Sequence, residues 1–250
     1  LDLANRKGKA PGGYQSTLSE ARLPFIFMNA AGTMSDVITM MHEGGHAVHS
    51  FLSHPLQLSA FKEYPMEIAE LASMSMELLT MNTWDAYFKD AHLLNRAKSE
   101  QLEGIIGTLP WIAQVDAFQH WIYESPSHTR EERSKKWMEI LQEFSSPEVD
   151  FNGLDNYRAY HWQRQLHLYE VPFYYIEYGI AQLGAIAMWR QYRQSKEQAL
   201  DNYMSALSLG YTKTLGELYA TAGIRFDFSP AYIKELADFV MPILNDMGVS

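Results

Sequence analysis

The pattern of hydrophobic and polar positions divides the chain into a short N-terminal β region and a series of long helices. Residues 1–23 are polar and contain several glycines, so we expect a loop there that could include a short strand. The run LPFIFMNA at 23–30 is apolar and rich in strand-forming residues, which predicts a strand. The turn AAGTMS follows, and Ser35 is the expected N-cap of a helix over about 36–53.

Helical periodicity dominates the rest of the chain. Pro55 ends the first helix, and residues 54–65 are expected to form a loop. The stretch MEIAELASMSMELLTMNTWDAYF, residues 66–88, predicts a long and mostly apolar helix. Further helical patterns cover about 90–124, 130–144, 172–194, 196–209 and 230–246. The expected fold class is therefore mostly α, with a small β element near the first helix.

The composition limits the number of domains that the chain can form and the classes of partner that it can bind. The chain has 250 residues, of which 47% are hydrophobic, enough for one large domain over 1–250 or at most two small ones. Its formal net charge of −10 argues against nucleic acid and anionic membranes as partners. There are no cysteines, which excludes a disulfide framework and cysteine metal ligands.

The N-terminal segment and the longest apolar run indicate where in the cell the protein is expected to lie. The longest apolar candidate, GIAQLGAIAMW at 179–189, is shorter than the roughly 20 residues that a membrane helix needs, and it predicts a buried helix. No signal peptide is visible, so we expect a cytoplasmic protein. The chain starts at Leu1 with a segment typical of the middle of a sequence, and we therefore expect a fragment of a longer protein.

The segment HEGGH, residues 42–46, matches the pattern H-E-x-x-H. Residues four apart share one face of a helix, so His42 and His46 could direct ring nitrogens at one ion. Zinc accepts such nitrogens at ~2.0–2.1 Å in tetrahedral sites. Glu43 lies off that line, where it could act as general base toward a water molecule. The alternative interpretation is a surface helix on which the glutamate is incidental.

A zinc site of this type needs a third protein ligand and an open fourth position. The extended metzincin pattern requires glycine at 49 and histidine at 52, but this chain has His49 and Leu52. His49 lies near the face of the histidine pair and is a weaker rival ligand, which we expect to pack beside the site.

The helix over 66–88 offers better candidates for the third ligand. Glu67, Glu70 and Glu77 interrupt its apolar run, and burying a carboxylate is costly unless it is paired or binds a metal. We expect one of them to bind the ion. Another could hold a ligand histidine by its second ring nitrogen, as metal-bound histidines usually require. The alternative is that all three face solvent or form surface pairs on the helix.

These motifs resemble the zinc peptidases of the thimet oligopeptidase and oligoendopeptidase F family. The likeness rests on HEGGHAVH followed by MEIAELASMSMELL, where the family has H-E-F-G-H-x-x-H and then E-x-x-S with flanking acids. The segments RKGKAPGGYQ and HLYEVPFYYIEYG are also similar to family segments. The departures are Gly44, where the family commonly has phenylalanine, and Ala72, where it commonly has proline. Family members are about twice as long as this chain.

The resemblance implies a zincin-like helical catalytic domain, the C-terminal catalytic half of an oligopeptidase. It implies one zinc ion held by His42, His46 and Glu70, with Glu43 as the general base. The family-like tyrosine-rich segment, by its position, makes His167, Tyr169 and Tyr178 the expected donors to the developing oxyanion. Gly45 matches the family glycine and is expected at a close-packing position, because a peptide substrate must bring its backbone close to this helix.

Three hypotheses about the function are consistent with these residues. The first is a zinc endopeptidase that cleaves internal bonds of short peptides, with the missing N-terminal part as a further partner. The second is a zinc carboxypeptidase or dipeptidyl carboxypeptidase, in which Arg158, Arg164 or Arg225 would bind the substrate carboxylate. The third is a truncated zinc-binding domain with little activity, although the intact Glu43 argues against degeneration.

Overall fold

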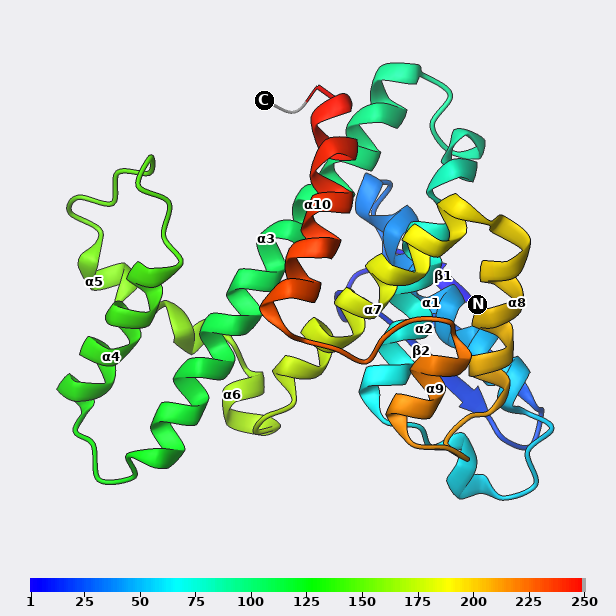
Figure 1. The fold of residues 1–250 in the computed structure, drawn as a ribbon, viewed down its shortest axis with the longest axis horizontal. Helices are drawn as coiled ribbons and strands as arrows, with labels where there is room; N and C mark the ends of the chain where they lie inside the picture. The colour runs from blue at the N-terminus through cyan, green and yellow to red at the C-terminus, as the bar shows by residue number, and fades with distance from the viewer. Residues whose placement is uncertain (249–250) are drawn as a thin grey trace. The chain divides into compact units, whose positions relative to one another are not determined.

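The computed structural model describes residues 1–248, and the chain forms two compact units. The first unit comprises Leu1–Gly104 and the chain from Ile180 onward, and the second comprises Ile105–Gly179. Two long helices, α3 (Ala91–Glu124) and α7 (Tyr175–Gln194), contribute residues to both units. Each unit is described separately below, and Figure 1 labels their elements.

A three-stranded sheet opens the first unit. The strands β1 (Asp2–Ala4), β2 (Gly13–Leu18) and β3 (Leu23–Ala30) lie in the order β1-β3-β2, with β1 parallel and β2 antiparallel to β3. The predicted strand at 23–30 is confirmed. Residues 1–23 were expected to form a loop that could include a short strand, and both β1 and β2 lie there. The six-residue β2 was not placed in advance because its sequence GYQSTL is polar and mostly exposed and so lacks the apolar alternation that marks a strand.

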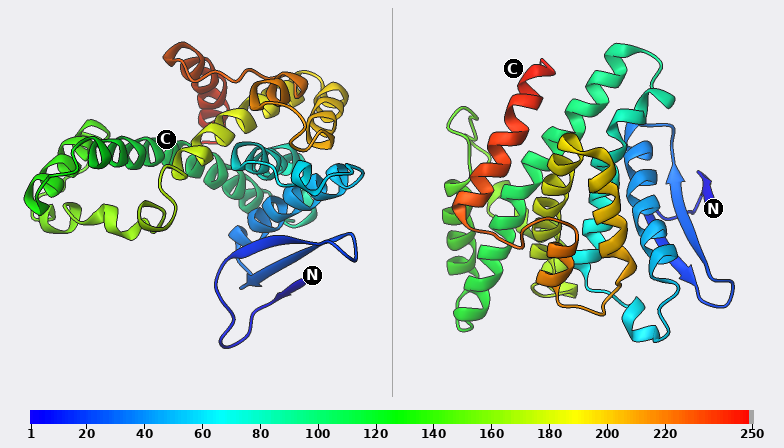
Figure 2. Two further views of the ribbon diagram at one scale, coloured as in Figure 1. Left: turned by 90° about the horizontal axis from the view of Figure 1, so that it is seen from below. Right: turned by 45° about the vertical axis from the view of Figure 1, so that its right-hand side comes forward.

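The sheet packs on α1 (Met34–Ser53), as the left panel of Figure 2 shows. Ile26 and Met28 of β3 form a buried cluster with Ala47 of α1. This contact places the central strand alongside the helix that carries the histidine motif.

The N-cap of α1 is Thr33, so the prediction of Ser35 was wrong. The reason is Asp36, whose carboxylate accepts the backbone N–H groups of Gly32 at 2.6 Å, Thr33 at 2.7 Å and Ala31 at 3.0 Å. These bonds satisfy donors that precede the helix and start it two residues earlier than the sequence indicates.

The predicted helices are present, with some differences at their ends. Those with bounds within one residue of the prediction are α3, α4 (Arg130–Glu143), α8 (Lys196–Ser208) and α10 (Pro230–Asp246). The predicted helix over 66–88 is α-helical only as α2 (Met66–Thr80) and continues as a 3-10 turn, Met81–Ala86. The hydroxyl of Thr80 donates to the carbonyl of Met76, and Thr83 donates to the carbonyl of Thr80. Such local bonds compete with the regular helix.

Short elements were not predicted because they carry too few residues for a periodic pattern. They are the helices α5 (Asp155–Arg158), α6 (His167–Glu170) and α9 (Leu215–Thr221), and the 3-10 turns Ser59–Lys62 and His161–Arg164.

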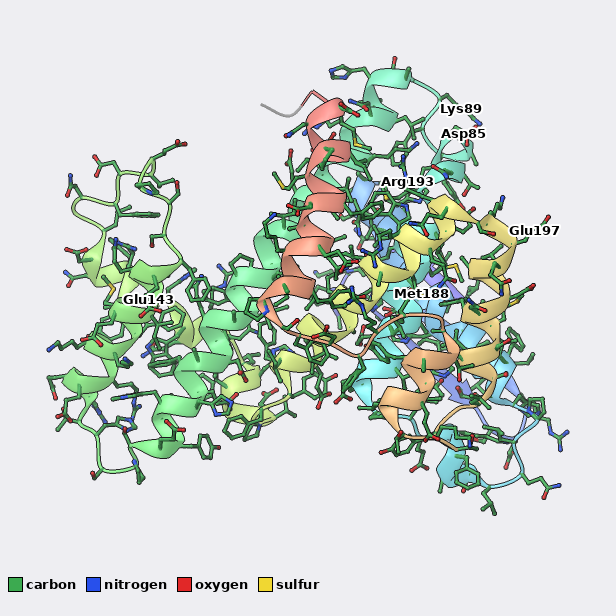
Figure 3. The ribbon with its side chains drawn as sticks, viewed as in Figure 1. Asp85, Lys89, Glu143, Met188, Arg193 and Glu197 are labelled. Carbon is green, nitrogen blue, oxygen red and sulfur yellow. The ribbon has the colours of Figure 1, made fainter. Side chains whose placement is uncertain are left out.

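The core of the first unit surrounds α2 and the later part of α7. Ile68, Leu71 and Leu78 of α2 are fully buried, as is Met188 of α7, which Figure 3 labels. Residues 179–189 were predicted to form a buried helix, and this part of α7 is indeed largely buried. Among the described residues, no helix combines the length and the apolar character required to cross a membrane.

The second unit has its own aromatic core. Phe118 of α3 and Trp137 of α4 are completely buried, and they cluster with Ile140 and Trp162. The rings of Phe118 and Trp137 meet edge to face with centroids 5.1 Å apart. This geometry is favourable for aromatic pairs.

Candidate metal centre

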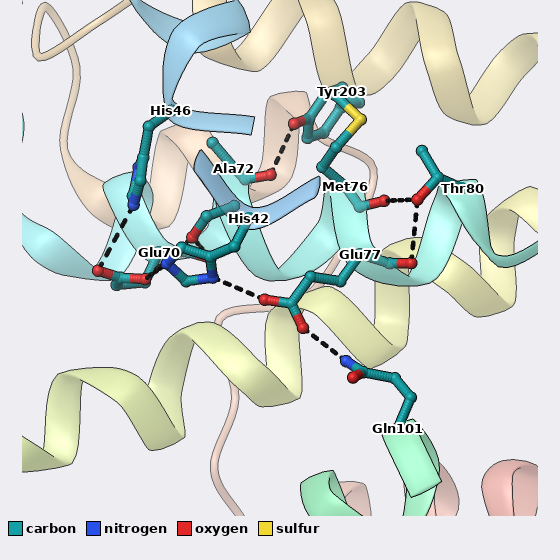
Figure 4. Close-up of polar contacts among 10 residues, drawn as sticks. His42, His46, Glu70, Ala72, Met76, Glu77, Thr80, Gln101 and Tyr203 are labelled. Carbon is teal, nitrogen blue, oxygen red and sulfur yellow. Dashed lines mark hydrogen bonds and ion pairs between the residues drawn. The ribbon is translucent and has the colours of Figure 1, made fainter. Parts of the chain in front are cut away.

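Helices α1 and α2 bring three ligand side chains together in the first unit. His42 and His46 lie one turn apart on α1, with ring centroids 4.9 Å apart and planes at 83°. Glu70 of α2 faces both rings (Figure 4): its Oε2 is 3.2 Å from Nε2 of His42, and its Oε1 is 3.8 Å from Nε2 of His46. One ligand atom from each residue lies within 4.8 Å of the others. Two imidazoles and one carboxylate are a donor set that zinc prefers.

Close packing of the two helices depends on Gly45. A Cβ atom added there would lie 2.6 Å from the carbonyl oxygen of Ala72 and 2.6 Å from Cα of Ser73. The expected close packing at Gly45 is therefore confirmed, but the backbone that approaches it is that of α2, where the approach of a peptide substrate was expected. A Cβ on Gly44 would meet nothing within 4 Å, so this second glycine is not required by packing among the described residues.

Glu70 is buried and is oriented by its own helix. The hydroxyl of Ser73 donates to Oε2 of Glu70 at 2.9 Å. Burial would raise the pKa of Glu70, but the hydrogen bond from His42 and the charges of both histidines lower it below the ordinary value. The carboxylate therefore stays ionised, which is the form that binds a cation.

His42 is held between two carboxylates. Its Nδ1 donates to Oε1 of Glu77 at 2.6 Å, which leaves Nε2 directed at Glu70. Burial would lower the pKa of His42, but hydrogen bonds to Glu70 and Glu77 raise it to about 10 in the absence of an ion. The prediction that one flanking glutamate binds a ligand histidine is confirmed for Glu77. Glu67 is only partly buried, and its backbone carbonyl accepts a bond from Tyr219.

His46 differs from His42 because, within residues 1–248, Glu70 is the one carboxylate that approaches it. Burial lowers its pKa to about 4, with a smaller opposing effect from the charge of Glu70. The ring is neutral at ordinary pH, so it offers a lone pair to a metal ion. The cluster thus supplies one neutral imidazole, one carboxylate and one imidazole whose Nε2 faces that carboxylate.

Glu43 is buried beside the cluster. Only 5% of its surface is exposed, and its Oε2 has no hydrogen-bond partner within residues 1–248. Burial raises the pKa of Glu43, with the charge of His42 and a backbone hydrogen bond from Gln15 acting in the opposite direction. A buried oxygen without a partner is unusual and is suited to hold a water molecule or a substrate proton.

His49 does not join the cluster of potential ligands. Its ring is fully buried and stacks on Tyr64 with centroids 3.5 Å apart. The expectation that His49 packs beside the site is confirmed.

The three residues expected to supply donors to the oxyanion lie in the second unit. The rings of His167 and Tyr178 meet edge to face with centroids 5.8 Å apart, within a cluster that includes Tyr174 and Tyr175. Tyr169 instead stacks on Trp162 at 5.8 Å, and about half of its surface is exposed. The structure therefore brings His167 and Tyr178 together and directs Tyr169 to a different neighbour.

The arginines considered as carboxylate binders all have other partners. Arg158 donates to the hydroxyl of Ser145 and stacks over Phe151, and Arg164 contacts His161 and Trp111. Arg225 forms an ion pair with Glu235.

Two contacts of the site were missed from the sequence. Gln101 of α3 donates its side-chain amide to Oε2 of Glu77 at 2.5 Å, and the backbone of Gln15 bonds to Glu43. Gln101 is one of many polar residues on a long helix, and a backbone donor leaves no mark in the sequence. Neither contact could therefore be predicted from the sequence.

Comparison with known proteins shows the family to which the chain belongs. The profile of peptidase family M3 matches residues 1–238. The chain belongs to peptidase family M3. The predicted resemblance to the oligoendopeptidase F zinc peptidases is thereby confirmed at the level of the family, as is the mostly α fold.

Curated M3-type relatives are similar over almost all of this chain. Oligopeptidase PepF of Bacillus subtilis is 25% identical over 255 residues, which cover 99% of this chain and 37% of the relative. The chromosomal oligoendopeptidase F of Lactococcus lactis subsp. cremoris is 22% identical, over 99% of this chain and 41% of the relative. The chain thus spans less than half the length of these relatives.

A solved structure described as PZ peptidase A with inhibitor 2 superposes with a TM-score of 0.87 and 33% identity. The match covers 98% of this chain and 43% of that one. Oligoendopeptidase F of Enterococcus faecium has a TM-score of 0.67 at 22% identity, which shows a shared fold.

Proposed function

We propose that this M3 chain carries the catalytic centre of a zinc-dependent endopeptidase that hydrolyses internal bonds of short peptides. The observation that supports it most directly is the convergence of His42, His46 and Glu70 beside Glu43, a buried carboxylate with an unpartnered oxygen. A structural zinc site has no need of a further carboxylate with an unpartnered oxygen beside its ligands, whereas a hydrolytic site requires a base there.

His42, His46 and Glu70 would hold one zinc ion, which supplies a Lewis acid that polarises the scissile carbonyl and acidifies water. Glu43 would accept the proton of the attacking water and transfer it to the leaving amine. Its buried position and raised pKa suit both steps, because a base that must later act as an acid works best with a pKa near the operating pH.

His167, Tyr169 and Tyr178 are proposed as donors to the oxyanion. Support comes from the neighbouring rings of His167 and Tyr178 and from the exposed position of Tyr169. Hydroxyl and imidazole N–H groups stabilise developing negative charge when they are held in place before the reaction.

Endopeptidase action is favoured over removal of C-terminal residues by one observation. Arg158, Arg164 and Arg225 each already bind a hydroxyl, a ring or a carboxylate, so none offers an unengaged guanidinium for a substrate carboxylate. Peptides with blocked and free C-termini should therefore be cleaved at similar rates.

We also propose that residues 1–250 act as the catalytic region of a longer oligopeptidase. The proposal is supported by the share of each relative that the chain covers, 37% for the Bacillus subtilis protein and 43% for PZ peptidase A. The remaining sequence would complete the substrate channel.

Elemental analysis of the purified protein tests the function, with Glu70→Ala beside the wild type. We expect close to one zinc per wild-type chain, little in the variant, and cleavage of an internally quenched peptide only by the zinc-loaded wild type. Ser205→Ala is a matched control, since its hydroxyl is remote in sequence from every ligand. A wild-type protein that binds no metal after reconstitution with zinc would contradict the proposal.

A further inference from the structure

A chain of three side chains reaches the metal cluster from a third helix. The amide nitrogen of Gln101, on α3, donates to Oε2 of Glu77 at 2.5 Å. The other oxygen of Glu77 accepts from Nδ1 of His42 at 2.6 Å (Figure 4). The three residues come from three helices and all belong to the first unit.

Gln101 and Glu77 are both removed from solvent. Gln101 is 7% exposed and Glu77 is 8% exposed. An ionised carboxylate at such a position is costly unless its oxygens are hydrogen-bonded. Each oxygen of Glu77 has one side-chain donor: His42 serves Oε1 and Gln101 serves Oε2.

The geometry determines what Gln101 can do. A carboxylate bound at only one oxygen can rotate about its last side-chain bond, whereas bonds at both oxygens fix its plane. A fixed Glu77 accepts from Nδ1 of His42 and so keeps Nε2 directed toward Glu70, as the nitrogen that an ion would use. Carboxylates in this position orient metal-binding histidines and raise their basicity.

We propose that Gln101 is a positioning residue for the metal centre. Through Glu77 it fixes the orientation of His42, without touching the ion or the substrate. The inference rests on the proposed function, because it assumes that His42 binds zinc.

A purely structural role would give a different result. If Gln101 served only to fill the core, its replacement would lower the stability of the fold and leave zinc affinity unchanged relative to other buried glutamines. Gln182 provides this comparison: it lies in the same unit, is also 7% exposed, and its side-chain nitrogen has no partner among the described residues.

The test measures zinc affinity and zinc dissociation rate by competition with a chromophoric chelator. Gln101→Met keeps the length of the side chain and removes the donor, and Gln182→Met is the matched control. We expect Gln101→Met to weaken zinc binding about tenfold, the lower end of the range for such outer partners, and Gln182→Met to leave it unchanged. Thermal unfolding followed by circular dichroism verifies that both variants fold.

A double-mutant cycle with Glu77→Gln separates positioning from independent effects. If Gln101 acts through Glu77, adding Gln101→Met to Glu77→Gln should weaken zinc binding by less than twofold. A tenfold loss in both backgrounds would overturn the inference. Should Gln101→Met fail to fold, Gln101→Glu removes the donor at nearly constant shape and is expected to weaken zinc binding at pH 8 at least as much.

The outcomes distinguish the two proposals. A wild-type protein without zinc affinity would overturn the proposed function and this inference together. A wild-type protein that binds zinc, while Gln101→Met binds it equally well, would overturn the inference alone.

Discussion

Gly45 of α1 lies against the carbonyl of Ala72 in α2, so closely that a Cβ atom would stand 2.6 Å from that oxygen. The backbone of a helix cannot give way as a flexible side chain can. Because Gly45 has no side chain, the two helices can approach each other closely. This spacing in turn sets the distance from the histidines to Glu70.

Replacement of this glycine should destabilise the fold, whereas replacement of its neighbour should not. We expect Gly45→Ala to lower the free energy of unfolding by about 1–3 kcal/mol, the usual cost of overpacking, and to weaken zinc binding. Gly44→Ala is the matched control and should stabilise the helix by up to about 1 kcal/mol, because it meets nothing within 4 Å. Urea denaturation of both variants measures the difference, and equal effects would contradict the assignment.

Tyr203 of α8 donates its buried hydroxyl to the same carbonyl of Ala72 at 2.7 Å. Tyr203→Phe removes one buried hydrogen bond at constant shape, and we expect a loss of roughly 1 kcal/mol in the free energy of unfolding. Tyr211→Phe, at an exposed tyrosine, should leave the stability unchanged. The measurement is the same urea titration, and a Tyr203→Phe protein as stable as wild type would refute the contribution of this bond.

Glu43→Gln separates catalysis from metal binding. The variant should retain zinc, because Glu43 is not among the three clustered ligands, and its kcat should fall by about 100-fold or more, because the amide cannot accept a proton. Zinc content and peptide turnover are measured on the same preparation. Turnover at the wild-type rate would exclude Glu43 as the base.

The residues of the tyrosine-rich segment should affect kcat without affecting zinc content. We expect His167→Gln, Tyr169→Phe and Tyr178→Phe each to lower kcat by about 100-fold, the usual effect of removing one donor to an oxyanion. Tyr160→Phe, an exposed tyrosine of the same unit, is the control. Unchanged kcat in any of the three would remove that residue from the proposed set.

Acid should destabilise the protein through His49. Burial, with a smaller contribution from His46, lowers the pKa of His49 from 6.5 to about 3. Between those values the unfolded chain binds the proton and the folded one does not, so stability falls as pH decreases below 6.5, by up to about 1.4 kcal/mol per pH unit.

His49→Phe keeps the ring stacked on Tyr64 and has no proton to bind. Its stability should therefore depend less on pH between 4.5 and 6.5 than that of wild type, as measured by urea midpoints. Parallel curves for the two proteins would show that His49 does not carry this dependence.

The sequence predicted the three clustered residues on two different grounds. His42 and His46 share a face at one turn of separation, whereas Glu67, Glu70 and Glu77 are all acids within an apolar run, and the family resemblance selected Glu70 among them. The choice between Glu67 and Glu77 as the partner of His42 needed the angle at which α1 crosses α2. That angle depends on Gly45 and its neighbours, whose contacts do not follow from periodicity.

Other features were beyond prediction for different reasons. The start of α1 depends on three backbone bonds to Asp36, whose donors lie in the preceding turn. Strand β2 is stabilised by its pairing with β3 and not by its own polar sequence. Gln101 is recognisable only once α3 is placed beside α2.

The residues of the metal cluster and the partner of His42 are also close along the chain. His42 and Glu77, the first and last of them, are separated by only 35 positions. The entropy lost in closing so short a loop is small, and contacts of low sequence separation form early in folding. The sheet reinforces this, because β3 precedes α1 directly and packs on it through Ile26 and Met28. The cluster is thus formed by one continuous stretch of chain, which can assemble before α8 and α9 pack on α1 and α2.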